Sequence, residues 1–268
     1  LVPTMLIAAL IFALLLAGPI GQPANYHAFA DQSSWQGLRH AGDVLSNIGF
    51  ALVGFVGLVI VSRAGAHEHF KHSQFAWQAF CISLILTAAG SAWYHLAPDN
   101  FRLIFDRLPI ALACASLLAA VRSDNVPGAR GTRDFLLLAI FALASVGWWV
   151  VTEQSGHGDL RPYLALQFAP LVIIPTWQAI YQAPKRERLV MANAIFLYVA
   201  AKAMELSDHQ VAELTGALTG HTLKHLLATA ASAAIVIQLY RRSLSQTSIR
   251  QTSVDQSSDA QLSVISRS

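Results

Sequence analysis

The sequence predicts an all-α polytopic membrane protein: a bundle of seven transmembrane helices with one further hydrophobic helix ahead of it. Of its 268 residues, 54% are hydrophobic and only 12% are charged, whereas about a quarter of the residues of a typical soluble domain are charged. Apolar stretches with few charges recur along the chain, and most approach the roughly 20 residues that an α-helix needs to cross a bilayer. They are too long and too uniformly apolar for the strands of a membrane barrel.

The first hydrophobic stretch, near residues 3–19, lacks a basic segment before it, and the nearest small-residue cleavage pattern is Ala-Phe-Ala at residues 28–30. A retained anchor is therefore favoured over a cleaved signal peptide. Turn-rich or charged segments separate the later helices. These seven helices are expected near residues 44–63, 77–97, 104–121, 134–152, 162–182, 189–206 and 217–240.

This pattern divides the chain into four parts. Residues 1–20 form the hydrophobic anchor or signal-like helix, residues 21–43 a loop outside the cytoplasm, and residues 44–242 the catalytic bundle. Residues 243–268 are rich in serine and glutamine, and they are expected to form a disordered cytoplasmic tail.

Basic residues give the expected orientation. Arginine and lysine gather in the connections after the second, fourth and sixth predicted helices and after the last one, while the opposite ends carry fewer. By the positive-inside rule, the basic side and the C-terminus face the cytoplasm. The histidine-rich tract at residues 67–72 then lies in a solvated cytoplasmic loop. The same bias accounts for the net charge of +3, so no nucleic-acid partner is expected.

Five polar residues of the predicted helices fall at one depth, towards the extracytoplasmic side: Ser91, His95, Asp106, His221 and His225. Ser91 and His95 are four residues apart, as are His221 and His225, so each pair shares a helix face. Ionisable groups inside membrane spans are costly and usually face the bundle interior, which makes them functional candidates.

Three imidazoles without a cysteine are typical of a catalytic zinc site, in which the fourth position stays open. A carboxylate from Asp106 and a hydroxyl from Ser91 could position a bound water molecule. The alternative is that each histidine only forms hydrogen bonds between helices.

Several neighbouring polar residues have two interpretations, either structural or in contact with the metal ligands. Ser46 and Asn47 could join helices by hydrogen bonds. Asp208 and His209, with Glu205, are expected to be solvated residues at a helix end, although a contact with the site or its entrance is the alternative. Lys224 is expected to extend outward towards the membrane interface.

An ordered set of motifs also carries a family resemblance. These motifs are Gly-Ser-Ala-Trp-Tyr-His-Leu at 90–96, Phe-Asp-Arg-Leu-Pro at 105–109, Gly-His-Thr-Leu-Lys-His-Leu at 220–226 and Leu-Ser-Asn-Ile-Gly-Phe at 45–50. Over roughly residues 40–240 the chain resembles the alkaline ceramidases, whose superfamily also contains the adiponectin receptors and a group of lipid-remodelling proteins. The resemblance is to a bacterial-type member, which implies a multi-pass protein of the bacterial inner membrane.

The resemblance implies that His95, His221 and His225 bind one zinc ion, and that Ser91 and Asp106 contact the zinc-bound water. It also implies a membrane-lipid substrate, ceramide, whose N-acyl bond is cleaved to give a sphingoid base and a fatty acid. Animal members have an acidic calcium site, but His40 stands where their glutamate is found, and no matching ligand set is visible. Calcium dependence is therefore not expected. The alternatives are a lipid acyl-ester hydrolase, a receptor or sensor, and a proton or metal transporter.

Overall fold

The computed structural model is helical apart from one short hairpin, and it describes residues 2–64 and 70–265, with side chains described as far as residue 244. Seven of its helical segments are long and apolar enough to cross a membrane, which confirms the seven predicted long apolar helices. They are α2 with α3 (Ala41–Leu45 and Ile48–Ala64), α4 (Gln74–Leu96), α5 (Asn100–Asn125), α6 (Gly131–Gln154), α7 (Arg161–Ile180), α8 (Lys185–Leu206) and α10 (Gly220–Ile265).

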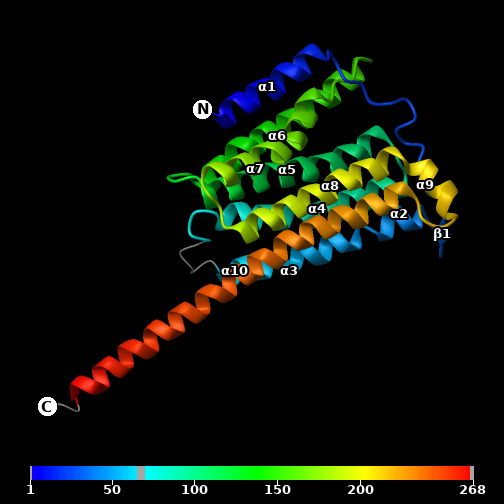
Figure 1. Cartoon of the computed structure of the whole chain (residues 1–268). Coiled ribbons are helices and arrows are strands. Elements are labelled where there is room, and N and C mark those ends of the chain that lie inside the picture. The colour runs from blue at the N-terminus through cyan, green and yellow to red at the C-terminus, as the bar shows by residue number, and fades with distance from the viewer. Residues whose placement is uncertain (1, 65–69, 266–268) are drawn as a thin grey trace.

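These helices lie side by side in one bundle, as Figure 1 shows. Helix α4 packs between α3 and α5, while α10 packs against α8 and α3. The interior is apolar, with fully buried side chains such as Leu103 and Ile174. Large apolar side chains such as Phe55, Ile140 and Phe196 are exposed on the outside. Helices that are apolar on their inner and outer faces are typical of membrane spans.

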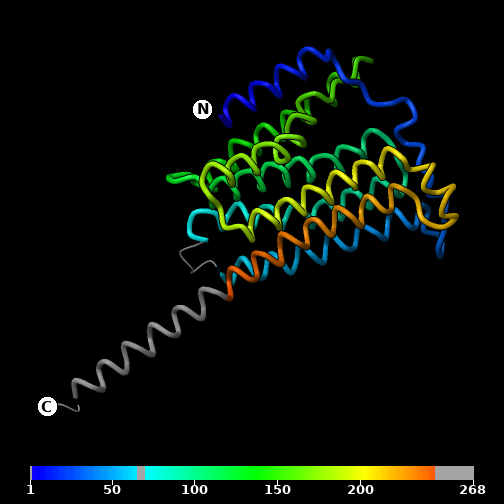
Figure 2. Tube along the Cα trace, viewed as in Figure 1, coloured from blue at the N-terminus to red at the C-terminus, as the bar shows by residue number. Residues whose placement is uncertain are grey.

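The first hydrophobic helix, α1 (Val2–Leu16), is shorter than the spans and lies against α7 at the edge of the bundle (Figure 1). Its retention as an anchor stays a prediction. Figure 2 follows α10 alongside α3 within the bundle. Disorder of the tail from residue 243 also stays a prediction. The histidine-rich tract at residues 67–72 lies partly outside the described residues.

Three small elements gather at one end of the bundle, where α4 ends and α5 and α10 begin (Figure 1). The hairpin of β1 (Ser34–Trp35) and β2 (Leu38–Arg39) turns through Gln36 and Gly37, whose φ angles of 50° and 83° suit a tight two-residue turn. The short α2 follows, and α9 (Asp208–Thr215) joins α8 to α10. The sequence interpretation assigned these residues to loops, because such short elements have no clear hydrophobic period.

Candidate metal centre

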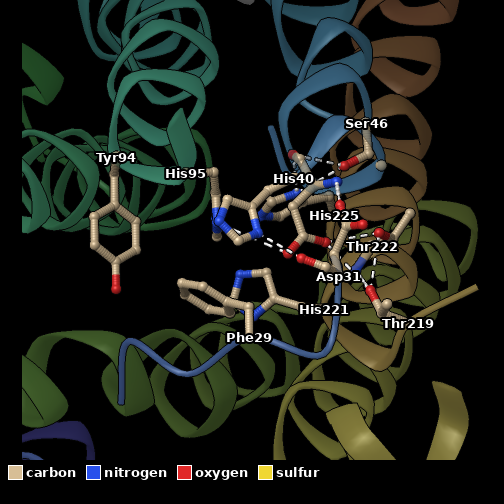
Figure 3. Close-up of polar contacts among 12 residues, drawn as sticks. Phe29, Asp31, His40, Ser46, Tyr94, His95, Thr219, His221, Thr222 and His225 are labelled. Atoms are coloured by element: carbon tan, nitrogen blue, oxygen red, sulfur yellow. Dashed lines mark hydrogen bonds and ion pairs between the residues drawn. The ribbon is translucent and has the colours of Figure 1, made fainter. Parts of the chain in front are cut away.

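Three buried histidines meet at this end of the bundle. His95 comes from the last turn of α4, and His221 and His225 come from the first two turns of α10. One ligand atom from each lies within 4.8 Å of the other two. Figure 3 shows the three rings turned towards one another. The predicted convergence is therefore confirmed, and the group could hold a metal ion.

The start of α10 is fixed by a close approach to the end of α8. A Cβ on Gly220 would lie 2.2 Å from the carbonyl oxygen of Met204, so only glycine allows this contact. The carboxylate of Asp208 accepts a hydrogen bond from the backbone N–H of His221 at 2.8 Å. This bond satisfies one of the free N–H groups at the start of the helix. It also fixes the backbone from which two of the three histidines extend.

The hydrogen bonds of the rings fit metal coordination. Both ring nitrogens of His95 are buried and have no hydrogen-bond partner among the described residues. Buried polar atoms are rarely left unpaired, so each such case needs an explanation. Nδ1 of His225 instead lies 2.8 Å from the hydroxyl oxygen of Ser46 and 3.1 Å from the carbonyl oxygen of Asp43, which leaves Nε2 of His225 for a ligand. A metal ion would satisfy one of the two nitrogens of His95 together with Nε2 of His225.

Asp43, on α2, lies behind two of the histidines. One carboxylate oxygen accepts a hydrogen bond from Thr222 at 2.7 Å. The other is 3.8 Å from Nδ1 of His95 and has no hydrogen bond to the part of the chain that the structure describes. The carboxylate of Asp31 accepts the backbone N–H of Asp43 at 2.9 Å. Although burial raises the pKa of Asp31, hydrogen bonds from Ser33 and from this N–H lower it below its usual value. Carboxylates that contact metal-binding histidines orient their rings.

The loop before the hairpin covers the histidines on one side. The ring of Phe29 packs edge-on against His95 and His221, with centroids 4.6 Å from each, and only 6% of Phe29 is exposed (Figure 3). Asp208 also holds this loop, because its second carboxylate oxygen accepts the N–H of Ala30 at 2.9 Å. The sequence interpretation did not identify Phe29, since one aromatic residue in a loop carries no pattern.

An apolar cavity of about 180 Å³ lies beside the metal-binding group. Its lining includes His225, Ser91 and Asp106, and most of the remaining lining is apolar side chains of α4, α5, α7, α8 and α10. The side chains of Ser91 and Asp106 are near enough to interact. Helices α4 and α5 touch directly here, because a Cβ on Gly90 would lie only 1.9 Å from the carbonyl oxygen of Phe105. The two predicted catalytic residues are thus adjacent to each other and share the cavity with a histidine.

Of the remaining predicted residues, three contact the metal-binding group, the backbone that carries it or Asp43 behind it, and one is exposed. Ser46 contacts His225, and Asn47 is buried and donates to the carbonyl oxygen of Asp43 at 2.8 Å. Asp208, expected to be solvated, is instead buried and binds the backbone of His221. His209 is exposed and contacts the carbonyl oxygen of Ala28.

Two further expectations about charged residues, besides that for Asp208, were wrong. Lys224 does not extend outward, and Glu205 is not a solvated helix-end residue. Both side chains are only 15% exposed and form an ion pair at 2.6 Å, and both line the cavity. On α10, Lys224 lies beside the face that carries the two histidines, so its side chain could point inward or outward. The ion pair with Glu205 on α8 turns it inward.

Comparisons with protein-family models, with curated proteins and with solved structures found no match for this chain. The family resemblance therefore stays a prediction that rests on the motifs. The arrangement itself combines three imidazole donors, a hydroxyl, a carboxylate and an apolar cavity. Chemically, it can hold a metal ion, move a proton and bind an apolar ligand.

Proposed function

We propose that the protein is a zinc-dependent lipid amide hydrolase of the membrane, with ceramide as the substrate that the family resemblance suggests. One observation supports this most strongly. The group of three buried histidines adjoins, through His225, an apolar cavity that Ser91 and Asp106 also line. A metal-binding group, a potential base and a hydroxyl donor thus face the space that an acyl chain would occupy.

The donor set favours zinc over calcium or magnesium. Calcium and magnesium prefer oxygen ligands, whereas imidazole nitrogens suit zinc, and three protein ligands with an open position are typical of catalytic zinc. When bound, zinc would lower the pKa of a coordinated water molecule to about 7 and so supply a nucleophile at neutral pH. A calcium ion is not part of the proposal, since calcium prefers oxygen ligands and the three groups that converge here are imidazoles.

The protein groups have separate roles in the proposed reaction. Asp106 accepts the proton of the attacking water and passes it to the amide nitrogen as the C–N bond breaks. Ser91 donates a hydrogen bond to the carbonyl oxygen as it gains negative charge. The reaction consumes one water molecule and releases a fatty acid and an amine. Asp43 and Ser46 hold the rings of His95 and His225 in place.

We further propose that the seven apolar helices cross a bacterial inner membrane, with the C-terminus in the cytoplasm and the metal centre towards the other side. Basic residues support this orientation. They gather at the end of the bundle opposite the histidines, in the connections after α3, α5 and α7 and in the last turns of the final span. The active site would then open towards the outer leaflet, where the acyl chains of a lipid can reach the cavity.

The test is to purify the full chain in detergent, measure its metal content, and assay release of fatty acid from ceramide. We expect about one zinc per chain, and we expect His95→Ala to lose both the metal and the activity. The matched control is His209→Ala, which removes an exposed histidine at the same end of the bundle. If the zinc-loaded parent hydrolysed neither ceramide nor other acyl amides or esters, the hydrolase proposal would be wrong, and a receptor or sensor would be favoured.

A further inference from the structure

Two lysines lie where the candidate active site meets the cavity. Lys202 on α8 and Lys224 on α10 each contact one oxygen of Glu205, at 2.6 Å in both cases. All three side chains line the cavity that also contains Ser91 and Asp106. Ionisable residues within membrane spans are costly, and they often mark the path or the binding site of a substrate.

The two ammonium groups have more N–H donors than they use in hydrogen bonds to the described residues. An ammonium group has three N–H donors, whereas Lys202 makes one hydrogen bond to the described residues. Lys224 makes two, to Glu205 and to Nε2 of His221 at 3.2 Å. Both lysines share the single carboxylate of Glu205. N–H donors of the pair therefore remain for a ligand.

The contact with His221 places Lys224 next to the reacting centre. A ring nitrogen that binds a metal ion cannot accept a hydrogen bond, so coordination through Nε2 would free one N–H of Lys224 for a ligand. An anionic group bound by this lysine would then lie close to the scissile bond. A lipid whose charged headgroup is many atoms away from the amide bond would not place its charge at this lysine.

We propose that Lys202 and Lys224 form a subsite for a carboxylate carried by an acyl lipid, and that the enzyme prefers N-acyl amino acids to neutral amides. The inference rests on the hydrolase function proposed above. A carboxylate has two acceptor oxygens, one for each ammonium group, and charge-assisted hydrogen bonds of this kind are the stronger class. In an N-acyl amino acid, a single carbon separates the carboxylate from the amide nitrogen. Ceramide carries no negative charge for these lysines.

Lys202 is the residue to change, because its hydrogen bond among the described residues goes to Glu205, and Glu205 keeps Lys224 as a partner without it. Binding of N-palmitoylglycine and of neutral N-palmitoylethanolamine is measured on the metal-free full chain in detergent. We expect Lys202→Gln to weaken N-palmitoylglycine about tenfold or more, as for loss of a hydrogen bond to a charged group, and to leave N-palmitoylethanolamine unchanged. Lys202→Arg should retain binding. Lys185→Gln, an exposed lysine at the far end of α8, is the matched control.

The same variants are then assayed with zinc. The parent should have a higher kcat/KM for N-palmitoylglycine than for N-palmitoylethanolamine, and Lys202→Gln should lose this preference. Equal weakening of both ligands would show a structural role for Lys202 and overturn the subsite. Palmitate, the fatty acid product, is the third probe. If Lys202→Gln weakened palmitate but not N-palmitoylglycine, the lysines would bind the product, and the substrate assignment would be wrong. If no amide were hydrolysed, the proposed function would fail, while the binding comparison would still decide the subsite.

Discussion

Asp43→Ala should weaken metal binding more than any other change outside the three histidines. The substitution removes the carboxylate oxygen that lies 3.8 Å from Nδ1 of His95, and His95 then has no anionic group at this nitrogen. It also removes the acceptor of Thr222, a hydrogen bond of 2.7 Å between buried groups. The backbone carbonyl of Asp43, which contacts His225, is retained. The substitution therefore acts on His95 directly, and on the start of α10 through the lost hydrogen bond of Thr222.

Loss of a group that orients a metal ligand typically costs 10- to 100-fold in affinity, which corresponds to about 1.4–2.8 kcal/mol. Zinc affinity is measured by competition with a chromophoric chelator on the detergent-solubilised protein. Asp43→Asn should lose less, since its amide oxygen can still accept from Thr222. Asp134→Asn is the control, because Asp134 is a buried carboxylate that pairs with Arg122 at the opposite end of the bundle. A folded Asp43→Ala protein with parental zinc affinity would refute the orienting role.

Three further predictions follow from the same contacts. Asp106→Asn should lower amide hydrolysis by about 10²–10⁴-fold, and Ser91→Ala by up to about 10²–10³-fold, with the zinc content of both unchanged; parental turnover by folded Asp106→Asn would exclude the proton-transfer role. Gly90→Ala should reduce the free energy of unfolding by about 1–3 kcal/mol, because its Cβ would lie 1.9 Å from the carbonyl oxygen of Phe105, whereas Gly147→Ala, with no atom within 4 Å, should not destabilise the protein; equal unfolding midpoints in denaturant would contradict this. The side chain of Arg161, with further hydrogen bonds from Trp148 and Ile20, holds the pKa of Asp159 below its usual value. The carboxylate therefore stabilises the fold fully above its unfolded-state pKa of about 3.9. This contribution is lost as the pH falls through the folded-state pKa. Asp159→Asn should therefore lower the thermal unfolding temperature most at pH 7, and progressively less as the pH falls from 5 towards 2. An equal decrease across this range would show that the charge is not responsible.

The sequence predicted the long helices and the histidine group because both depend on strong local patterns. Apolar runs define each span from Ala41–Ala64 onward, and the order of the spans places His95 at the same end as His221 and His225. The predicted limits differ from the observed ones by a few residues, since helix ends depend on capping groups. The last span continues without a break into the region expected to be the tail.

The contacts around the histidines could not be predicted, because they join residues far apart in the chain. Asp43 lies 52 positions before His95, and the pairing of their side chains depends on the turn that starts α2. Lys224 follows His221 by three residues, so it can lie beside it or extend into lipid, and the position of Glu205 on α8 decides between the two. A helical pattern gives the face of each residue but not which face of another helix lies opposite.

The origin of the three histidines has a consequence for how the bundle comes apart. His95 is on α4 and the other two are on α10, and these helices pack chiefly against α3, α5 and α8. A bound metal ion would therefore act as a crosslink between two elements separated by more than 120 positions in the chain. A ligand that binds only the folded form stabilises it in proportion to the logarithm of its concentration over its dissociation constant. When α10 is pulled mechanically, the main resistance would then come from the bound metal ion. Removal of the metal ion by a chelator would let α10 separate from the bundle gradually instead of in one step.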